Sequence, residues 1–167
     1  MNALIKGLAI ALVSFIADQW SKFYIFNLLD SKATNSIEIL PFFNLVKVYN
    51  YGVSFGMFND IAHGRLILSI IALSITIALC VWLYKVTKMY MIVALGLIIG
   101  GAIGNIVDRI RIGAVADFID VYVGNYHWPA FNIADSTIFI GVAILFIDSF
   151  ITKDESNKEQ KDEKNSS

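Results

Sequence analysis

Long apolar stretches alternate with polar segments along the chain, and four of them are long enough to cross a membrane. They cover residues 3–28, 66–84, 89–107 and 133–150. An α-helix of about 20 residues spans the roughly 30 Å hydrocarbon core of a bilayer. The pattern therefore predicts four transmembrane helices, an even number that places both termini on the same side of the membrane.

The two longer connecting segments, residues 29–65 and 108–132, lie on the side opposite the termini. The first contains two runs of strand-favouring residues, 37–40 and 43–49, separated by Pro41. The predicted fold class is an all-α membrane protein, with four transmembrane helices and a small extracytoplasmic β-sheet and loop on the membrane surface.

The short turn between the second and third apolar stretches orients the chain, although basic residues are nearly balanced between the two sides overall. This turn contains Lys85 and Lys88 and no acidic residue. Short cytoplasmic loops carry an excess of Lys and Arg. We therefore expect both termini in the cytoplasm and both long segments outside it.

The composition supports a membrane protein and excludes some other classes. Hydrophobic residues make up 57% of the 167 residues and charged residues 16%, with a mean hydropathy of +0.65. The net charge of −1 argues against a nucleic-acid partner. Residues 153–167 are polar and mixed in charge, so we predict a membrane domain over residues 1–152 and a disordered, dispensable cytoplasmic tail after it.

Asp117 and Asp135 are the candidate catalytic residues, because both lie beside membrane-spanning stretches. A charge at the bilayer centre costs roughly 2.5–3.5 kcal/mol, so acids at membrane depth usually have a function. Two neighbouring carboxyl groups cannot both ionise cheaply, and the proton that they share is the basis of aspartyl-protease chemistry.

Other polar residues at the ends of the stretches allow structural and functional interpretations. Asn105, Asp108 and Arg109 share one side of a helix end, where Asp108 and Arg109 could form a capping pair. Arg109 could equally bind a substrate carbonyl or keep a catalytic acid ionised. Asn132 suits a helix N-cap, and Asp135 a first-turn acid that complements the helix dipole.

Asp18 and Lys22 are four residues apart, so an internal ion pair is the structural alternative to a role in a pocket. Gly96, Gly100 and Gly104 share a helical face, which favours close helix packing. His63 and His127 show no metal-ligand spacing and suit the membrane interface, and we expect neither a metal nor a cofactor.

The segment 50–58 combines two glycines with several aromatic residues. It could be a structural amphipathic loop or a loop that binds substrate. We expect it to close over bound substrate, with Gly52 and Gly56 giving backbone freedom and Phe55 and Phe58 apolar contact.

With these residues in place, the chain closely resembles the bacterial lipoprotein signal peptidases, or type II signal peptidases, over about residues 10–150. Five blocks in order carry the resemblance: DQWSK at 18–22, NYGVSFG at 50–56, GGAIGNIVDR at 100–109, VADFID at 115–120 and FNIADS at 131–136. Each block alone is weakly specific, but the ordered set on a four-helix frame is highly specific.

The resemblance implies an inner-membrane aspartyl endopeptidase with its site near the outer leaflet. Such enzymes remove the signal peptide from a diacylglyceryl-modified prolipoprotein, cleaving just before the lipidated cysteine. Asp117 and Asp135 match the catalytic pair. The candidate pocket residues are Asp18, Lys22, Asn50, Gly52, Phe55, Asn105, Asp108, Arg109 and Asn132. The implied partners are the prolipoprotein and the bilayer, and we expect a monomer.

A small proton- or cation-coupled transporter component is the alternative, because Asp18, Asp117 and Asp135 could also bind protons or cations. Transport sites lie near the bilayer midplane, typically within broken helices. Here the acids cluster at helix ends on one side, which favours a peptidase. A lipid-binding scaffold would not require two such acids.

Overall fold

The structure is a computed structural model that describes residues 2–52 and 61–165. Its elements are α1 (Ala3–Ser31), β1 (Ser36–Leu40), β2 (Phe43–Asn50), α2 (Ile61–Lys85), α3 (Met89–Ile112), β3 (Val115–Val123), β4 (Tyr126–His127) and α4 (Ile133–Asn165). Four helical segments are long and apolar enough to span a membrane: Ala3–Ser31, Leu66–Lys85, Met89–Ile112 and Ile133–Ile151. The predicted membrane fold is confirmed.

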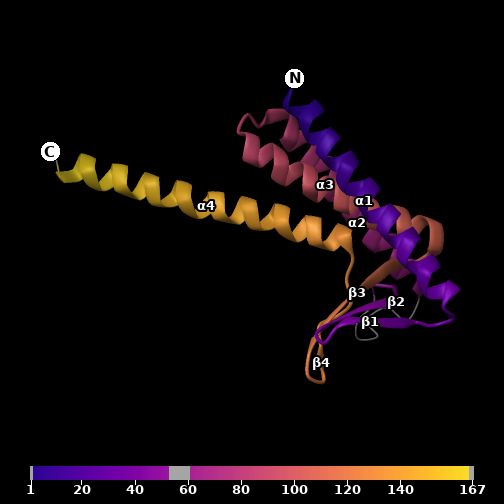
Figure 1. The fold of residues 1–167 in the computed structure, drawn as a ribbon. Coiled ribbons are helices and arrows are strands. Elements are labelled where there is room, and N and C mark those ends of the chain that lie inside the picture. Colours follow the sequence, from indigo (N-terminus) through magenta and orange to yellow (C-terminus); the bar gives the residue numbers. More distant parts are fainter. Residues whose placement is uncertain (1, 53–60, 166–167) are drawn as a thin grey trace.

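Helix α3 is the central helix of the fold, and α1, α2 and α4 all pack against it (Figure 1). Its glycines make this possible, because a Cβ atom on Gly100 would lie 2.4 Å from the carbonyl oxygen of Ala11 on α1. A Cβ on Gly96 would lie 2.8 Å from the carbonyl oxygen of Gly7. The predicted close helix packing is confirmed, and it brings the polar end of α3 against that of α1.

The strands form one antiparallel sheet in the order β1-β2-β3-β4, at the end of the helices away from the N-terminus (Figure 1). Strands β1 and β2 lie where the sequence predicts them. Strand β3 differs from expectation, because we placed Asp117 at a helix end and it lies within β3, opposite Val48. Residues 115–123 are rich in β-branched and aromatic side chains, and β2 supplies the hydrogen-bonding partner that completes the strand.

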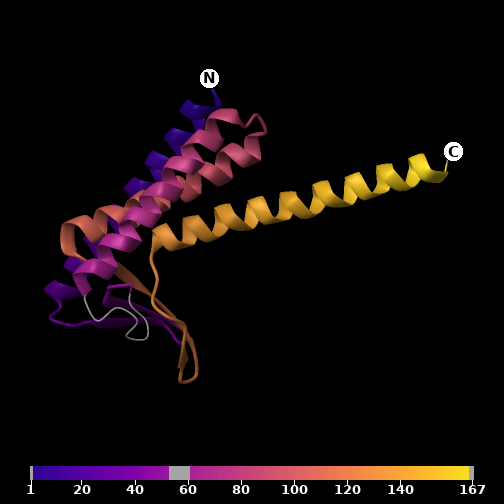
Figure 2. The ribbon, with the colours of Figure 1, turned by 180° about the vertical axis from the view of Figure 1, so that it is seen from behind.

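The C-terminal tail also differs from expectation in its backbone. We predicted disorder over residues 153–167, whereas α4 continues as helix to Asn165. The segment is rich in Glu, Lys and Gln, which have high intrinsic helix propensity, and it extends a helix that begins at Ile133, so no new helix has to be nucleated. This end of the helix projects away from the other elements (Figure 2). Whether the tail is dispensable stays a prediction.

Candidate active site

Asp117 is held in the middle of the polar site by two asparagine side chains. Its Oδ1 accepts a hydrogen bond of 2.7 Å from Asn132 Nδ2, and its Oδ2 accepts one of 3.0 Å from Asn50 Nδ2. Asn50 ends β2, so the β2–β3 pairing brings it beside Asp117. Asp117 is 1% exposed. Burial raises the pKa of this carboxyl to about 6, and the negative charge of Asp135 adds to the effect.

Asn132 and Asp135 cap the start of α4 reciprocally. The backbone N–H of Asp135 donates to Asn132 Oδ1 at 2.9 Å, and the backbone N–H of Asn132 donates to Asp135 Oδ2 at 3.2 Å. This is the geometry of a capping box, here built from Asn and Asp. The predicted N-cap and first-turn acid are therefore both present. They also fix the Asp135 carboxylate at the mouth of the site.

Asn105 connects the two aspartates to the polar end of α1. Its Nδ2 donates to Asp135 Oδ1 at 2.8 Å, while its Oδ1 accepts from Asn132 Nδ2 and Lys22 Nζ, both at 3.2 Å. One amide thus contacts a candidate catalytic acid, the residue that caps it and a buried cation. Among the described residues, the two carboxylates have no direct hydrogen bond and are joined through these amides.

Lys22 is the buried cation of the site, and two carboxylates neutralise it. Its Nζ lies 2.7 Å from Asp18 Oδ2 and 2.7 Å from Asp108 Oδ2. The predicted Asp18–Lys22 pair is confirmed, whereas Asp108 pairs with Lys22 instead of Arg109. Asp18 Oδ1 also accepts from the backbone N–H of Ala134 at 2.9 Å, which anchors α1 to the first turn of α4.

Arg109 lies beside this cluster with its guanidinium partly free of hydrogen bonds. Its Nη1 donates to the carbonyl oxygen of Asn105 at 3.3 Å, and its buried Nε has no partner among the described residues. The positive charge is close enough to Asp117 and Asp135 to interact with both electrostatically. This position is compatible with a role in keeping an acid ionised.

Gly52 follows Asn50 and fixes its side chain. The Gly52 N–H donates to Asn50 Oδ1 at 2.9 Å, and Gly52 adopts a φ of 74°, in the left-handed region that favours glycine. Phe55, Gly56 and Phe58 lie outside the described residues. The expected closure of this segment over a substrate therefore stays a prediction.

Gln19 is a site residue that the sequence analysis did not assign. Its Nε2 donates to Asp108 Oδ1 at 2.9 Å, to Asp18 Oδ2 at 3.1 Å and to the carbonyl oxygen of Gly104 at 3.3 Å. The available signal was an uncharged polar residue inside an apolar stretch, next to Asp18. Gly104 also belongs here, because a Cβ atom on it would lie 2.5 Å from Asp18 Oδ2.

The arrangement as a whole is suited to proton transfer. A buried acid with a raised pKa and a second acid lie on opposite sides of Asn132, and the ion cluster of Lys22, Asp18 and Asp108 lies beside them. Within the part of the chain that the structure describes, no three His, Cys, Asp or Glu side chains are grouped as a metal site.

Comparisons with known proteins agree with this arrangement. A family model described as signal peptidase (SPase) II matches residues 10–151. Lipoprotein signal peptidase of Alteromonas mediterranea is 43% identical over 159 residues, covering 93% of this chain and 86% of its relative. The one from Vibrio parahaemolyticus is 42% identical over 153 residues, covering 90% of each.

Solved structures give the same result for the fold. A bacterial membrane enzyme structure obtained by the in meso method at 2.3 Å resolution is 34% identical, with a TM-score of 0.70, covering 91% of this chain and 90% of that one. No comparison supports the transporter alternative. The chain therefore belongs to the signal peptidase II family of membrane peptidases.

Proposed function

We propose that this protein removes the signal peptide from diacylglyceryl-modified prolipoproteins by aspartyl endopeptidase chemistry, cleaving just before the lipidated cysteine. Asp117 and Asp135 are the catalytic pair in this proposal. The observation that carries it is the bridging position of Asn132, which donates through Nδ2 to Asp117 and through its backbone N–H to Asp135. The relatives' printed name, lipoprotein signal peptidase, supports the substrate class.

The reaction needs one proton shared by the pair. The ionised aspartate takes a proton from a water molecule, which attacks the scissile carbonyl carbon, while the protonated aspartate donates to the carbonyl oxygen. The aspartate that took the proton from water then gives it to the departing amine as the C–N bond breaks, and the carbonyl oxygen returns its proton to the other aspartate. Burial holds the pKa of Asp117 at about 6, well above that of an exposed carboxyl, which favours a shared proton closer to neutral pH.

The surrounding residues orient the pair. Asn50 and Asn132 fix both oxygens of Asp117, and Asn105 fixes Asp135. Lys22 and Asp18 set the relative position of α1 and the first turn of α4. We assign Arg109 to electrostatic stabilisation of the ionised acid, and Gly52 to the conformation of Asn50.

We place the protein as a monomer in the bacterial inner membrane, with both termini in the cytoplasm and the site near the outer leaflet. Lys85 and Lys88 flank the α2–α3 turn, which lies at the same end as the N-terminus, opposite the sheet (Figure 1). The positive-inside preference supports this orientation.

The test is cleavage of a synthetic diacylglyceryl-modified prolipoprotein by purified wild type, Asp117→Asn and Asp135→Asn, followed by mass spectrometry. Asn is nearly isosteric with Asp but cannot exchange a proton. Both variants should therefore fold, and their cleavage rate should be about 10²–10⁴-fold lower than that of wild type. Asp148→Asn, which changes an acid near the far end of the membrane-spanning part of α4, Ile133–Ile151, is the control and should retain activity. Near-normal turnover by either site variant would remove that residue from the pair.

A further inference from the structure

An apolar groove adjoins Asp135 along α4. Its volume is about 510 Å³, and it is lined by Trp128, Phe131, Asp135, Ser136, Phe139 and Ile140. The four residues from α4 recur at the i, i+4 spacing of one helical face. The neighbouring face packs on α3, since Cβ atoms on Gly101 and Gly141 would meet the carbonyl oxygens of Ala134 and Ala94. The groove therefore runs beside the α3–α4 contact, from a candidate catalytic acid along a membrane-spanning helix.

Trp128 and Phe131 form the wall of this groove on the side of the sheet, and backbone hydrogen bonds fix their main chain. Phe131 N–H donates to the Ile119 carbonyl oxygen at 3.1 Å, and Ile119 N–H donates back to Phe131 at 2.8 Å. Trp128 N–H donates to the carbonyl oxygen of Val121 at 2.8 Å. These bonds attach both aromatic residues to β3, the strand that carries Asp117. The wall is thus part of the same rigid unit as the site.

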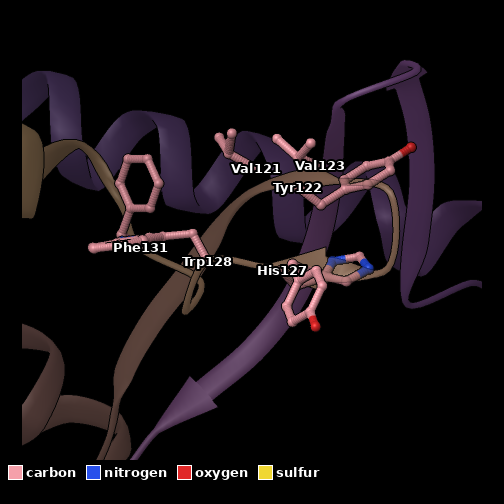
Figure 3. A pocket seen from close by; sticks show the side chains of 7 residues that line it. Val121, Tyr122, Val123, His127, Trp128 and Phe131 are labelled. Atoms are coloured by element: carbon pink, nitrogen blue, oxygen red, sulfur yellow. The ribbon is translucent and has the colours of Figure 1, made fainter.

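The apolar surface continues past this wall onto the β3–β4 hairpin. Figure 3 shows a second hollow, of about 500 Å³, where Trp128 and Phe131 lie at one side and the stacked rings of Tyr122 and His127 at the other. Trp128 and Phe131 line both hollows. His127 Nδ1 lies 2.9 Å from Asp120 Oδ1, a contact that ties the hairpin together. Trp128 and Phe131 therefore lie between the groove along α4 and the hollow on the hairpin, and they line both.

We propose that the α4 groove binds an acyl chain of the diacylglyceryl group on the substrate cysteine. This inference rests on the proposed function, because it takes the scissile bond to lie at Asp117 and Asp135. The modified cysteine directly follows that bond, so its thioether-linked lipid must leave the site within a few atoms of Asp135. The groove begins at this acid and follows α4 for about 7.5 Å, the rise of five helical residues.

The lining favours an alkyl chain over a peptide backbone. An extended peptide buried away from water needs partners for its N–H and C=O groups. In the groove, the Ser136 hydroxyl already donates to the carbonyl oxygen of Asn132 at 3.0 Å, and the other lining residues besides Asp135 are apolar. Phe139 and Ile140 are 75% and 49% exposed in the protein alone, so they are free to contact a lipid chain.

The first experiment compares Phe139→Ala and Ile140→Ala with Phe146→Ala, which removes an exposed ring from the same helix outside the groove. Each enzyme is given one prolipoprotein peptide carrying either two palmitoyl or two butyryl chains. We expect the groove variants to raise KM about 5- to 20-fold for the palmitoyl substrate only, because truncation removes side-chain contacts that only the longer acyl chain can make. The kcat should change less than about twofold, and Phe146→Ala should behave as wild type.

An equal effect of the groove variants on both substrates would indicate a structural role and overturn the assignment. So would an effect of Phe146→Ala as large as that of Phe139→Ala. A wild-type enzyme that cleaves neither substrate would instead refute the proposed function. The dependence of KM on the length of the acyl chain therefore tests the groove assignment, whereas cleavage by the wild-type enzyme tests the proposed function.

The second experiment locates the chain directly. A prolipoprotein with a photoreactive diazirine in one acyl chain is bound to Asp117→Asn, irradiated in lipid vesicles and mapped by mass spectrometry. Labels within residues 128–140 are expected. Labels confined to α1 or α2 would overturn the groove while leaving the cleavage results unaffected.

Discussion

Asn132 combines a structural and a chemical role in one side chain. Its Oδ1 caps α4 by accepting from Asp135 N–H, and its Nδ2 donates to Asp117. These two functions use different atoms of the amide, so they can be separated by substitution.

Asn132→Ser should retain the cap and lose the link to Asp117. Serine is as good an N-cap as asparagine, but it leaves the buried Asp117 Oδ1 without its Asn132 donor, so stability should fall by about 1–3 kcal/mol and cleavage about 10- to 100-fold. Asn132→Ala should lose the cap as well and cost about a further 1 kcal/mol. Thermal unfolding in detergent and a cleavage assay give the two readouts. Wild-type cleavage by the serine variant would show that the Asp117 contact is unimportant.

The raised pKa of Asp117 has a consequence for stability. Its ordinary value of 3.8 becomes about 6 in the folded protein, so between these values the folded state binds more protons than the unfolded state. Wild type should therefore lose stability relative to Asp117→Asn as the pH rises from about 4 to about 6, and the difference should then level off. The total is at most about 3 kcal/mol. A difference in the free energy of unfolding between the two proteins that stays constant from pH 4 to 7 would contradict this.

At the scale of elements, the end of β2 and the residues after it control Asn50. Gly52 holds this side chain through its N–H and adopts a left-handed conformation. A Cβ atom on Gly52 would also lie 2.6 Å from Leu68 Cδ1 on α2. The turn at Gly52 thus lies between the end of β2 and helix α2, and it holds the Asn50 side chain that donates to Asp117.

Gly52→Ala should lower cleavage about 5- to 20-fold by shifting Asn50 away from Asp117, because backbone strain and the Leu68 contact both act on the turn. Gly124→Ala is the matched control, since Gly124 also has a positive φ, of 58°, but has open space around its Cβ position. It should lose about 1 kcal/mol of stability and no activity. Equal activity losses in both variants would refute a specific role for Gly52.

At the scale of the whole molecule, α3 and its small residues bring together the polar ends of α1 and α4. The sheet then places Asp117 over that cluster. The end of α4 contributes to neither, because it projects away from the other elements (Figure 2).

Deletion of residues 153–167 should therefore leave cleavage and thermal stability unchanged within error. The segment contains no apolar side chain and cannot bury enough surface to contribute to the fold. Activity and unfolding of the truncated protein in vesicles are the measurements. A large loss of either would show that the tail docks on a partner or on the membrane.

The sequence by itself determined the four membrane helices, strands β1 and β2, the Asp18–Lys22 pair and the glycine face of α3. These features depend on local periodicity and on the length that a bilayer requires, so they can be recognised within one segment. The two candidate acids could also be recognised, because ionisable groups beside apolar stretches are rare.

Only the tertiary structure decided how those acids are held. Strand β3 requires a partner from β2, and the Asn50–Asp117 contact joins positions 67 residues apart. Asp108 could have paired with its neighbour Arg109, but the packing of α1 against α3 gives it Lys22 instead. Such choices depend on which distant groups are buried together, because a buried charge or amide must be satisfied by whatever the fold brings within reach.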